Sequence, residues 1–270
     1  MLHVEHLKKT YGEGVRAVEA IGDVSLEIRE NELVCIVGPS GCGKTTLLKC
    51  MSGLLPPTSG EVRLGDERVS GPPERMALVF QEYSRSLYPW MTVRQNVAFP
   101  LKRKRLGKDE ARRLVEEAVG SVGLSGALDR YPWQLSGGMQ QRVAIARALA
   151  YQPDILLMDE PFASVDAQTR ADLEHEVLEV RRRYGVTIVF VTHDIDESVY
   201  LSDRIMVLTP SPTEVQEVLT VDLPQPRDQV ATKELSEFAH LRGHVWRSIK
   251  RRQTDEDTGG AAASHVASAG

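Results

Sequence analysis

A glycine-rich stretch near the start of the chain carries the residue types that bind a polyphosphate. In order, it reads Gly38-Pro39-Ser40-Gly41-Cys42-Gly43-Lys44-Thr45-Thr46. This fits the phosphate-binding loop pattern G-x-x-x-x-G-K-[ST]. Glycines allow backbone angles at which successive N–H groups point into one concavity. We expect Lys44 to reach the β- and γ-phosphates of a nucleotide and the Thr45 hydroxyl to ligate Mg²⁺.

The elements expected on either side of this loop are those that such a site requires. The apolar run 33–37 is typical of a buried parallel strand, and residues 46–51 have the composition of an opening helix. The order strand, glycine loop, helix brings the free N–H groups and dipole of the helix to the phosphates. An ordinary glycine turn is the alternative, but it would need neither flanking element.

A pair of acids predicts a second part of the same site. The apolar run 155–158 leads directly into Asp159 and Glu160. Buried acids cost free energy unless they bind a metal or move a proton, and ligands of α/β sheets bind at this end of the strands. Asp159 suits Mg²⁺, directly or through water, and Glu160 suits polarising the water that attacks a γ-phosphate. An ion pair at the start of a loop is the simpler alternative.

Three further features are weak signals when each is taken alone. Tyr11 stands at an expected turn, where its ring could stack on a nucleotide base or simply pack. Ser136, with two glycines behind it, could help to bind an anion or only cap the helix that follows. His193 follows a strand expected over 186–192 and could contact a γ-phosphate or cap a helix.

The composition is ordinary for a soluble globular protein. The chain has 270 residues, of which 41% are hydrophobic and 26% charged, and its net charge of -5 gives no general argument for nucleic-acid binding. Cys35, Cys42 and Cys50 fit no zinc pattern, and their odd number argues against a disulfide framework, so we expect a reducing, cytoplasmic compartment. We expect no signal peptide and no membrane span, because the apolar runs are far shorter than the ~20 residues that a span needs.

The remaining pattern predicts how the chain is organised. Alternating residues over 1–30 predict half-exposed antiparallel strands. From about 82 to 150, helical periodicity predicts a helical insertion between two strands of the sheet. Apolar residues spaced by three and four predict a C-terminal amphipathic helix within 226–252, and the polar, Gly/Ala/Ser-rich residues 253–270 are expected to be disordered.

Taken together and in order, these features resemble the nucleotide-binding subunit of ATP-binding-cassette (ABC) transporters over about residues 1–225. The features are the loop 38–46, a strand ending in Gln81, the helical insertion, Leu-Ser-Gly-Gly at 135–138, the acid pair, Ala-Ser-Val-Asp at 163–166, and His193 after a strand. The segment 135–142 is the most specific mark. The resemblance implies an α/β fold with a P-loop NTPase (RecA-like) core, an N-terminal antiparallel β subdomain and an inserted α-helical subdomain.

The resemblance implies roles for residues within one chain. Tyr11 would stack on adenine, residues 38–46 would be the Walker A loop that binds ATP, and 158–160 would end the Walker B strand. Gln81 would sense Mg²⁺ and the attacking water, and His193 would be the switch histidine. The implied catalytic set is Glu160, His193, Gln81 and Lys44, and the implied Mg²⁺ ligands are Thr45, Gln81 and Asp159.

The resemblance also implies a site completed by a second subunit. Ser136, Gly137 and Gly138 would be the signature loop, which binds the γ-phosphate of ATP held by the other subunit, and Asp166 would belong to the D-loop at the interface. A homodimer, or a pair with a second ATPase subunit, would bury two ATP molecules head to tail. The sequence departs from the family pattern at two places. Met139 stands where the family often has Gln, and Ala-Ser-Val-Asp at 163–166 replaces Ser-Ala-Leu-Asp. The second departure puts the first D-loop hydroxyl contact in doubt.

Partners outside the chain follow from the same resemblance. Opening and closing of the dimer would drive integral-membrane permease subunits, with an extracytoplasmic solute-binding protein acting indirectly and no nucleic-acid partner. The chain would lie peripherally on the cytoplasmic face of the inner (plasma) membrane. Residues 81–93 and 132–134 are similar to those of importers of the nitrate, sulfonate and taurine group, and residues 82–100 would receive the permease.

Three alternatives remain open at this stage. In another P-loop enzyme, such as a kinase or a GTPase, residues 135–138 would be an ordinary helix cap, and the acid pair and Gln81 would be unconnected to them. An ABC ATPase that acts on DNA or ribosomes usually carries a long coiled coil or two cassettes, for which this chain has no room. The ATPase of an efflux system is the nearest alternative within transport.

Overall fold

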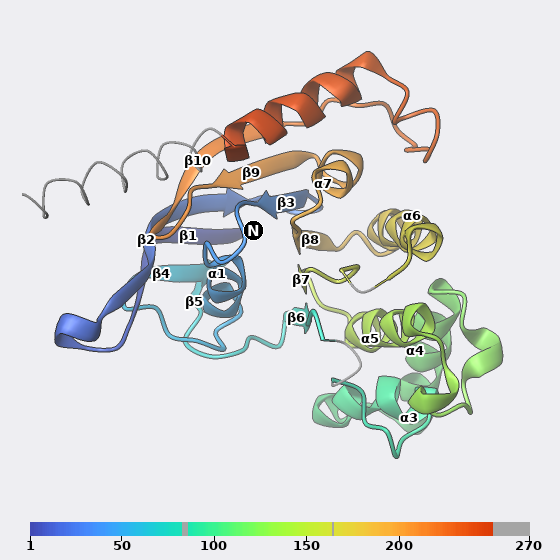
Figure 1. Ribbon diagram of the computed structural model, residues 1–270. Coiled ribbons are helices and arrows are strands. Elements are labelled where there is room, and N and C mark those ends of the chain that lie inside the picture. Colours follow the sequence, from blue (N-terminus) through green and yellow to red (C-terminus); the bar gives the residue numbers. More distant parts are fainter. Residues whose placement is uncertain (83–85, 164, 251–270) are drawn as a thin grey trace, which may run out of the picture.

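A ten-stranded sheet runs through the molecule in the computed structural model, which describes residues 1–82, 86–163 and 165–250. Its strand order is β5-β4-β1-β2-β10-β9-β3-β8-β7-β6 (Figure 1). The strands are β1 (Leu2–Tyr11), β2 (Val18–Ile28), β3 (Leu33–Val37), β4 (Ser59–Leu64), β5 (Glu67–Arg68), β6 (Met76–Val79), β7 (Ile155–Asp159), β8 (Thr187–Val191), β9 (Arg204–Leu208) and β10 (Thr213–Thr220).

Helices fill most of the connections between the strands. The α-helices are α1 (Lys44–Met51), α3 (Val93–Ala98), α4 (Lys108–Ser121), α5 (Gly137–Ala150), α6 (Ala167–Tyr184) and α7 (Ile195–Leu201). The short 3-10 helices are η1 (Gly14–Arg16), η2 (Phe99–Lys104), η3 (Ser125–Ala127) and η4 (Pro132–Gln134). Among the described residues, every helix is too short or too polar to span a bilayer.

The N-terminal part of the sheet is antiparallel, as the alternation over residues 1–30 predicts. Strand β1 pairs with β2 on one side and with β4 on the other, and β4 continues into the short β5. Strand β10 joins this part to the rest, because it pairs parallel with β2 and antiparallel with β9. The expected antiparallel strands are therefore confirmed.

The other part of the sheet is the parallel core. Strand β3 lies between β9 and β8, followed by β7 and β6, and all four pairings are parallel. Strands β3, β7 and β8 are buried along their whole length. Parallel strands covered on both faces are expected to be continuously apolar, which is why the runs 33–37 and 155–158 could be recognised without alternation.

Two hydrophobic cores lie on opposite faces of this parallel sheet. Along β3, the side chains of Leu33, Cys35 and Val37 face the core formed with helices α3 to α7. The intervening Val34 and Ile36 face the core formed with α1 and the N-terminal strands. This alternation is the period of two expected of a strand. Figure 1 agrees, with α1 beside β1 and β4 and with α3 to α6 on the other side.

Between β6 and β7, the described chain is helical, as the sequence predicts. Helix α3 begins at a capping box in which Thr92 accepts a hydrogen bond from the Gln95 amide and Gln95 accepts one from the Thr92 amide. Helix α4 buries Leu114, Val115 and Ala118 on one face. The domain boundaries at about 82 and 150 stay a prediction.

The described part of the C-terminal helix lies within the predicted range 226–252. Residues 236–250 are helical, and this helix lies along β9 and β10 at the top of Figure 1, with Phe238 and Val245 buried. Ahead of it, Asp228 accepts hydrogen bonds from the amides of Val230 and Ala231, a turn that competes with helix formation. The predicted tail, 253–270, lies outside the described residues.

Candidate functional site

The glycine loop connects the end of β3 to the start of α1, as expected. Gly41 and Gly43 have left-handed backbone angles, with φ of 77° and 107°, and Gly43 is the N-cap of α1. Gly38 is needed for a different reason than the sequence suggests, because its backbone is not left-handed. A Cβ at Gly38 would lie 3.1 Å from both Cys42 Sγ and Leu208 Cβ. Close packing, and not a special angle, therefore disfavours a side chain at this position.

Lys44 lies inside the loop. Its side chain is buried, with 5% of the residue exposed, and its Nζ donates hydrogen bonds to the carbonyls of Gly38 at 2.9 Å and Pro39 at 3.0 Å. A buried ammonium needs such acceptors. The positive charge thus stands at the N-terminus of α1, where free N–H groups and the helix dipole also favour an anion.

Thr45 and Asp159 join the loop to the end of β7. The Thr45 hydroxyl donates a hydrogen bond to Asp159 Oδ1 at 3.2 Å, and Asp159 is buried. Burial raises the pKa of Asp159, the Thr45 hydroxyl opposes this, and the nearby charge of Glu160 raises it further. A hydroxyl and a desolvated carboxylate are oxygen ligands that suit a hard cation such as Mg²⁺, which commonly binds through one or two carboxylates together with substrate phosphates.

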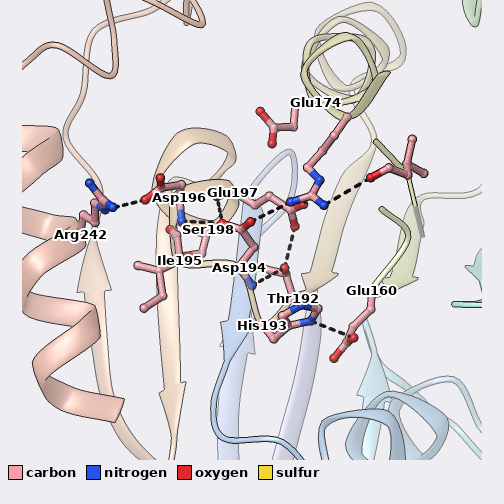
Figure 2. Close-up of polar contacts among 12 residues, drawn as sticks. Glu160, Glu174, Thr192, His193, Asp194, Ile195, Asp196, Glu197, Ser198 and Arg242 are labelled. Atoms are coloured by element: carbon pink, nitrogen blue, oxygen red, sulfur yellow. Dashed lines mark hydrogen bonds and ion pairs between the residues drawn. The ribbon is translucent and has the colours of Figure 1, made fainter. Parts of the chain in front are cut away.

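Side chains that follow three neighbouring parallel strands come together at Glu160. His193 Nδ1 lies 3.0 Å from Glu160 Oε2, as Figure 2 shows, and Gln81 Nε2 donates to the same oxygen at 3.3 Å. These residues follow β8, β7 and β6, whose carboxyl ends meet at this edge of the sheet. The structure therefore brings together Gln81, Glu160 and His193, which lie far apart in the sequence.

The backbone of Glu160 is fixed in a conformation that is uncommon for a residue with a side chain. Its φ is 42°, and its amide donates to the carbonyl of Val191 at 2.9 Å. A strained angle of this kind persists only where neighbouring structure holds it, and such angles gather at functional sites. Here the hydrogen bond to β8 holds Glu160 so that its carboxylate points toward His193 (Figure 2).

The loop that carries His193 is held on both sides of that residue. Thr192 donates from its hydroxyl to Glu197 Oε2 at 2.6 Å, and the Asp194 amide donates back to that hydroxyl at 2.9 Å. Asp194 caps α7 by accepting from the amides of Asp196 and Glu197. Capping, which the sequence left as the alternative role for His193, is carried out by Asp194.

Tyr11 lies next to the glycine loop. Its hydroxyl is 3.2 Å from the Thr46 hydroxyl, and the residue is 43% exposed. The Lys9 ammonium lies 5.4 Å from the centre of the Tyr11 ring. An exposed aromatic face beside a phosphate loop is suitably placed to stack on the base of a bound nucleotide.

The segment 136–138 lies against α6, the helix that Asp166 caps, and not against the glycine loop. Ser136 is the N-cap of α5 and accepts from the Met139 amide at 3.3 Å, while Asp166 is the N-cap of α6 and accepts from the Thr169 amide at 3.0 Å. A Cβ added at Gly138 would overlap the Thr169 methyl group. Among the described residues, no hydrogen bond joins Ser136 or Asp166 to residues 38–46.

Two residues of this region were not predicted from the sequence. Arg170, on the first turn of α6, donates to Asp194 Oδ2 at 2.9 Å, and Glu197 is buried with its pKa raised to about 7, chiefly by burial. The one available signal was their spacing from a helix start, because Arg170 is the fourth residue of α6 and Glu197 is the third residue of α7. That spacing has no chemical meaning until the two helices are placed side by side.

Comparison with known proteins identifies relatives of the chain. The family model described as "ABC transporter" matches residues 21–163. An uncharacterised ABC transporter ATP-binding protein of Methanocaldococcus jannaschii is 48% identical over 92% of this chain and 91% of its own. The nitrate import ATP-binding protein NrtC of Synechococcus elongatus is 42% identical over 93% of this chain and 38% of its own. The bicarbonate transport ATP-binding protein CmpC of the same species is 43% identical over 90% of this chain and 37% of its own.

Solved structures give the same result for the fold. The dimeric structure of a bacterial ABC transporter cassette matches with a TM-score of 0.72 and 34% identity over 82% of this chain and 99% of that chain. A dimeric post-hydrolysis state of that cassette, bound to ADP and phosphate, matches with a TM-score of 0.71 and 33% identity over the same shares.

Proposed function

The chain belongs to the ABC transporter family as an ATP-binding subunit that hydrolyses ATP, and from this premise we propose that it drives an importer for a small anionic solute. The single observation that carries the proposed chemistry is the contact of Gln81 and His193 with one carboxylate oxygen of Glu160. Nitrate and bicarbonate are the solutes in the names of two relatives, and both are small anions. Nitrate, a sulfonate or taurine is the solute that we propose.

In this proposal, ATP lies across the glycine loop, with its adenine on Tyr11 and its phosphates at the N-terminus of α1. Lys44 turns from the carbonyls of Gly38 and Pro39 to the β- and γ-phosphates, exchanging two neutral acceptors for charged ones. Thr45, Asp159 and Gln81 would hold Mg²⁺. When bound, this ion neutralises the charge on the β- and γ-phosphate oxygens.

The hydrolytic step then depends on Glu160. Its carboxylate accepts a hydrogen bond from the water that attacks the γ-phosphorus, and the bond to the bridging oxygen breaks to leave ADP and phosphate. Gln81 and His193 hold Glu160 Oε2 on one side and leave the carboxylate aimed at the water. Because both contacts go to a single oxygen, the other oxygen is available to the water.

We further propose that two copies, or this chain with a second ATPase subunit, enclose ATP between them. Ser136 and Gly137 are exposed at the start of α5, and Asp166 is exposed at the start of α6. Their side-by-side placement suits contact with a nucleotide held by the other subunit. Dimeric structures of a similar cassette support this arrangement. Hydrolysis would remove the γ-phosphate contacts and open the dimer.

The partner of the dimer would be a pair of integral-membrane permease subunits, served by an extracytoplasmic solute-binding protein. A groove of about 480 Å³ separates the β6 edge from the helices and is lined by Phe80, Tyr88, Phe99 and Tyr151 among others. Such a groove suits a helix of the permease, which would hold the chain at the cytoplasmic face of the membrane. Trp90, which lies close to Tyr88 in the sequence, is 70% exposed and is not among the residues that line this groove.

Reconstitution with the permease tests this function. The chain is co-expressed with the membrane proteins that co-purify with it. Uptake of nitrate, taurine and an alkanesulfonate is then measured in vesicles that contain ATP, with the extracytoplasmic solute-binding protein added outside. ATP-dependent uptake of one of these solutes, absent with a Lys44→Ala chain, is the expected result. Turnover of ATP accompanied by export of solute, or by uptake of none of the three, would contradict the proposal.

A further inference from the structure

Arg170 connects two segments of the site that are far apart in the sequence. The first is the stretch before α6 that ends in Asp166, and the second is the loop that carries His193. Arg170 Nη1 donates to Asp194 Oδ2 at 2.9 Å, and Nη2 donates to the carbonyl of Val165 at 3.4 Å. One planar guanidinium therefore contacts the residue after His193 and the residue before Asp166.

The contact with Asp194 matters because Asp194 fixes the local path of the chain. Its other carboxylate oxygen caps α7, and its amide is held by the Thr192 hydroxyl. His193 stands between these two residues, so a shift of Asp194 would carry the imidazole with it. The 3.0 Å separation of His193 Nδ1 from Glu160 Oε2 would then change.

Charge gives a second reason for a cation at this position. Asp194 and the buried Glu197 both lie within reach of Arg170, whose Nε is 3.5 Å from Glu197 Oε1. Two carboxylates that share a partly buried site repel each other unless a cation lies between them. The guanidinium is 29% exposed and Glu197 is 5% exposed, so this interaction is shielded from most of the solvent.

Arg170 also shares an enclosed space with the hydrolytic residues. A cavity of about 10 Å³ is lined by Glu160, Ala163, Arg170, Thr192, His193, Asp194 and Glu197. A space of this size is small and leaves room for about one water molecule. Arg170 therefore forms one wall of the chamber in which His193 meets Glu160.

From these contacts, we propose that Arg170 is a positioning residue for ATP hydrolysis, which locks the segment 165–166 to the His193 loop. A subunit that docks on Asp166 would thereby influence the geometry of His193 and Glu160. In this proposal, Arg170 acts through Asp194 and Val165 and not on the reacting atoms. This inference rests on the proposed roles of Glu160 and His193.

The test separates positioning from binding and from folding. Arg170→Met is compared with wild type in steady-state ATPase assays, and we expect kcat to fall about ten- to a hundredfold, the range for a slightly misplaced catalytic group, with KM for ATP within about twofold. Arg170→Lys should recover part of kcat, because it restores the charge but not the planar fork. Arg181→Met is the matched control, since Arg181 lies on the same helix and pairs with Asp203 away from the site. It should lower thermal stability and keep kcat.

If Arg170→Met lowers stability, a double-mutant cycle still tests whether Arg170 acts on kcat through Asp194. Asp194→Asn combined with Arg170→Met should lose less in kcat than the sum of the single losses, because both variants break one contact. The inference is overturned if Arg170→Met keeps kcat within about twofold of wild type, if the whole loss lies in KM, or if the cycle is additive. Glu160→Gln is assayed in parallel, and full activity in that variant would instead overturn the proposed role of Glu160.

Discussion

His193 Nδ1 lies 3.0 Å from Glu160 Oε2, although the two residues follow different strands and are separated by the whole of α6. The pairing arises because β7 and β8 are neighbouring parallel strands whose carboxyl ends meet. Gln81, at the end of β6, completes the group from the other side.

Replacing Glu160 by Gln should separate ATP binding from hydrolysis. The amide keeps the shape of the carboxylate but cannot take the proton of the attacking water, so kcat should fall by two or more orders of magnitude. Affinity for ATP, measured by fluorescence or calorimetry, should stay near that of wild type, and ATP should hold the variant as a dimer. Glu234→Gln, at an exposed position, is the control and should be fully active. Hydrolysis at the wild-type rate by Glu160→Gln would remove Glu160 from its role.

Replacing Lys44 by Ala should weaken nucleotide binding itself. The variant loses charged hydrogen bonds to the phosphates, and bonds of that type contribute about 1.5–3 kcal/mol, so Kd for ATP should rise roughly ten- to a hundredfold. The control is Lys49→Ala, an exposed lysine on the same helix. If both variants bind ATP equally well, the phosphate contacts assigned to Lys44 are wrong.

Replacing Gly138 by Ala should destabilise the contact between α5 and α6. A Cβ at Gly138 overlaps the Thr169 methyl group, and overpacking of this kind costs about 1–3 kcal/mol in the free energy of unfolding. Thr169→Ser removes that methyl group, so the double variant should recover much of the lost stability in denaturant unfolding. If Gly138→Ala lowers the free energy of unfolding by the same amount with and without Thr169→Ser, the overlap with the Thr169 methyl group is not what disfavours alanine at this position.

The pair formed by Glu176 and Arg142 predicts a dependence of stability on pH. Burial raises the pKa of Glu176 from 4.5 to about 7, although Arg142 Nη1 lies 2.5 Å from its carboxylate. Between these two values the unfolded chain binds fewer protons than the folded one, so stability from this group falls as pH rises from about 4.5 to 7. The free energy of unfolding of wild type minus that of Glu176→Gln should therefore decrease over this range and then level off.

The control for this pH series is Glu179→Gln on the same helix. The Glu179 side chain is 44% exposed, and a hydrogen bond from Arg182 lowers its pKa, so its contribution should be constant above pH 5. A wild-type advantage over Glu176→Gln that grows with pH would mean that Arg142 outweighs burial. Such a result would reverse the sign assigned to the Glu176 pKa.

The sequence predicted most of the fold and site because its signals were local. The loop 38–46 is a contiguous motif, and the strands 33–37 and 155–158 are continuously apolar because both of their faces are buried. Asp159 and Glu160 were recognisable as acids directly after such a strand. In each case, the residues that carry the signal are adjacent in the chain.

What the sequence did not predict depends on contacts between distant elements. Arg170 acquires its meaning only when α6 lies beside the His193 loop. A side chain at Gly38 is disfavoured by the approach of Leu208, which lies on a neighbouring strand.

The central claim is that each ATP is held between loop 38–46 of one subunit and Ser136 of the other, and mixed dimers test it most directly. Ser136→Glu and Lys44→Ala are placed either in opposite subunits or together in one subunit beside a wild-type partner, and ATP hydrolysis is measured. In the proposed arrangement, opposite placement leaves one intact site and should retain about half of the activity, whereas placement together damages both sites. Activity only when both changes share one subunit would show that each chain completes its own site and would contradict the account.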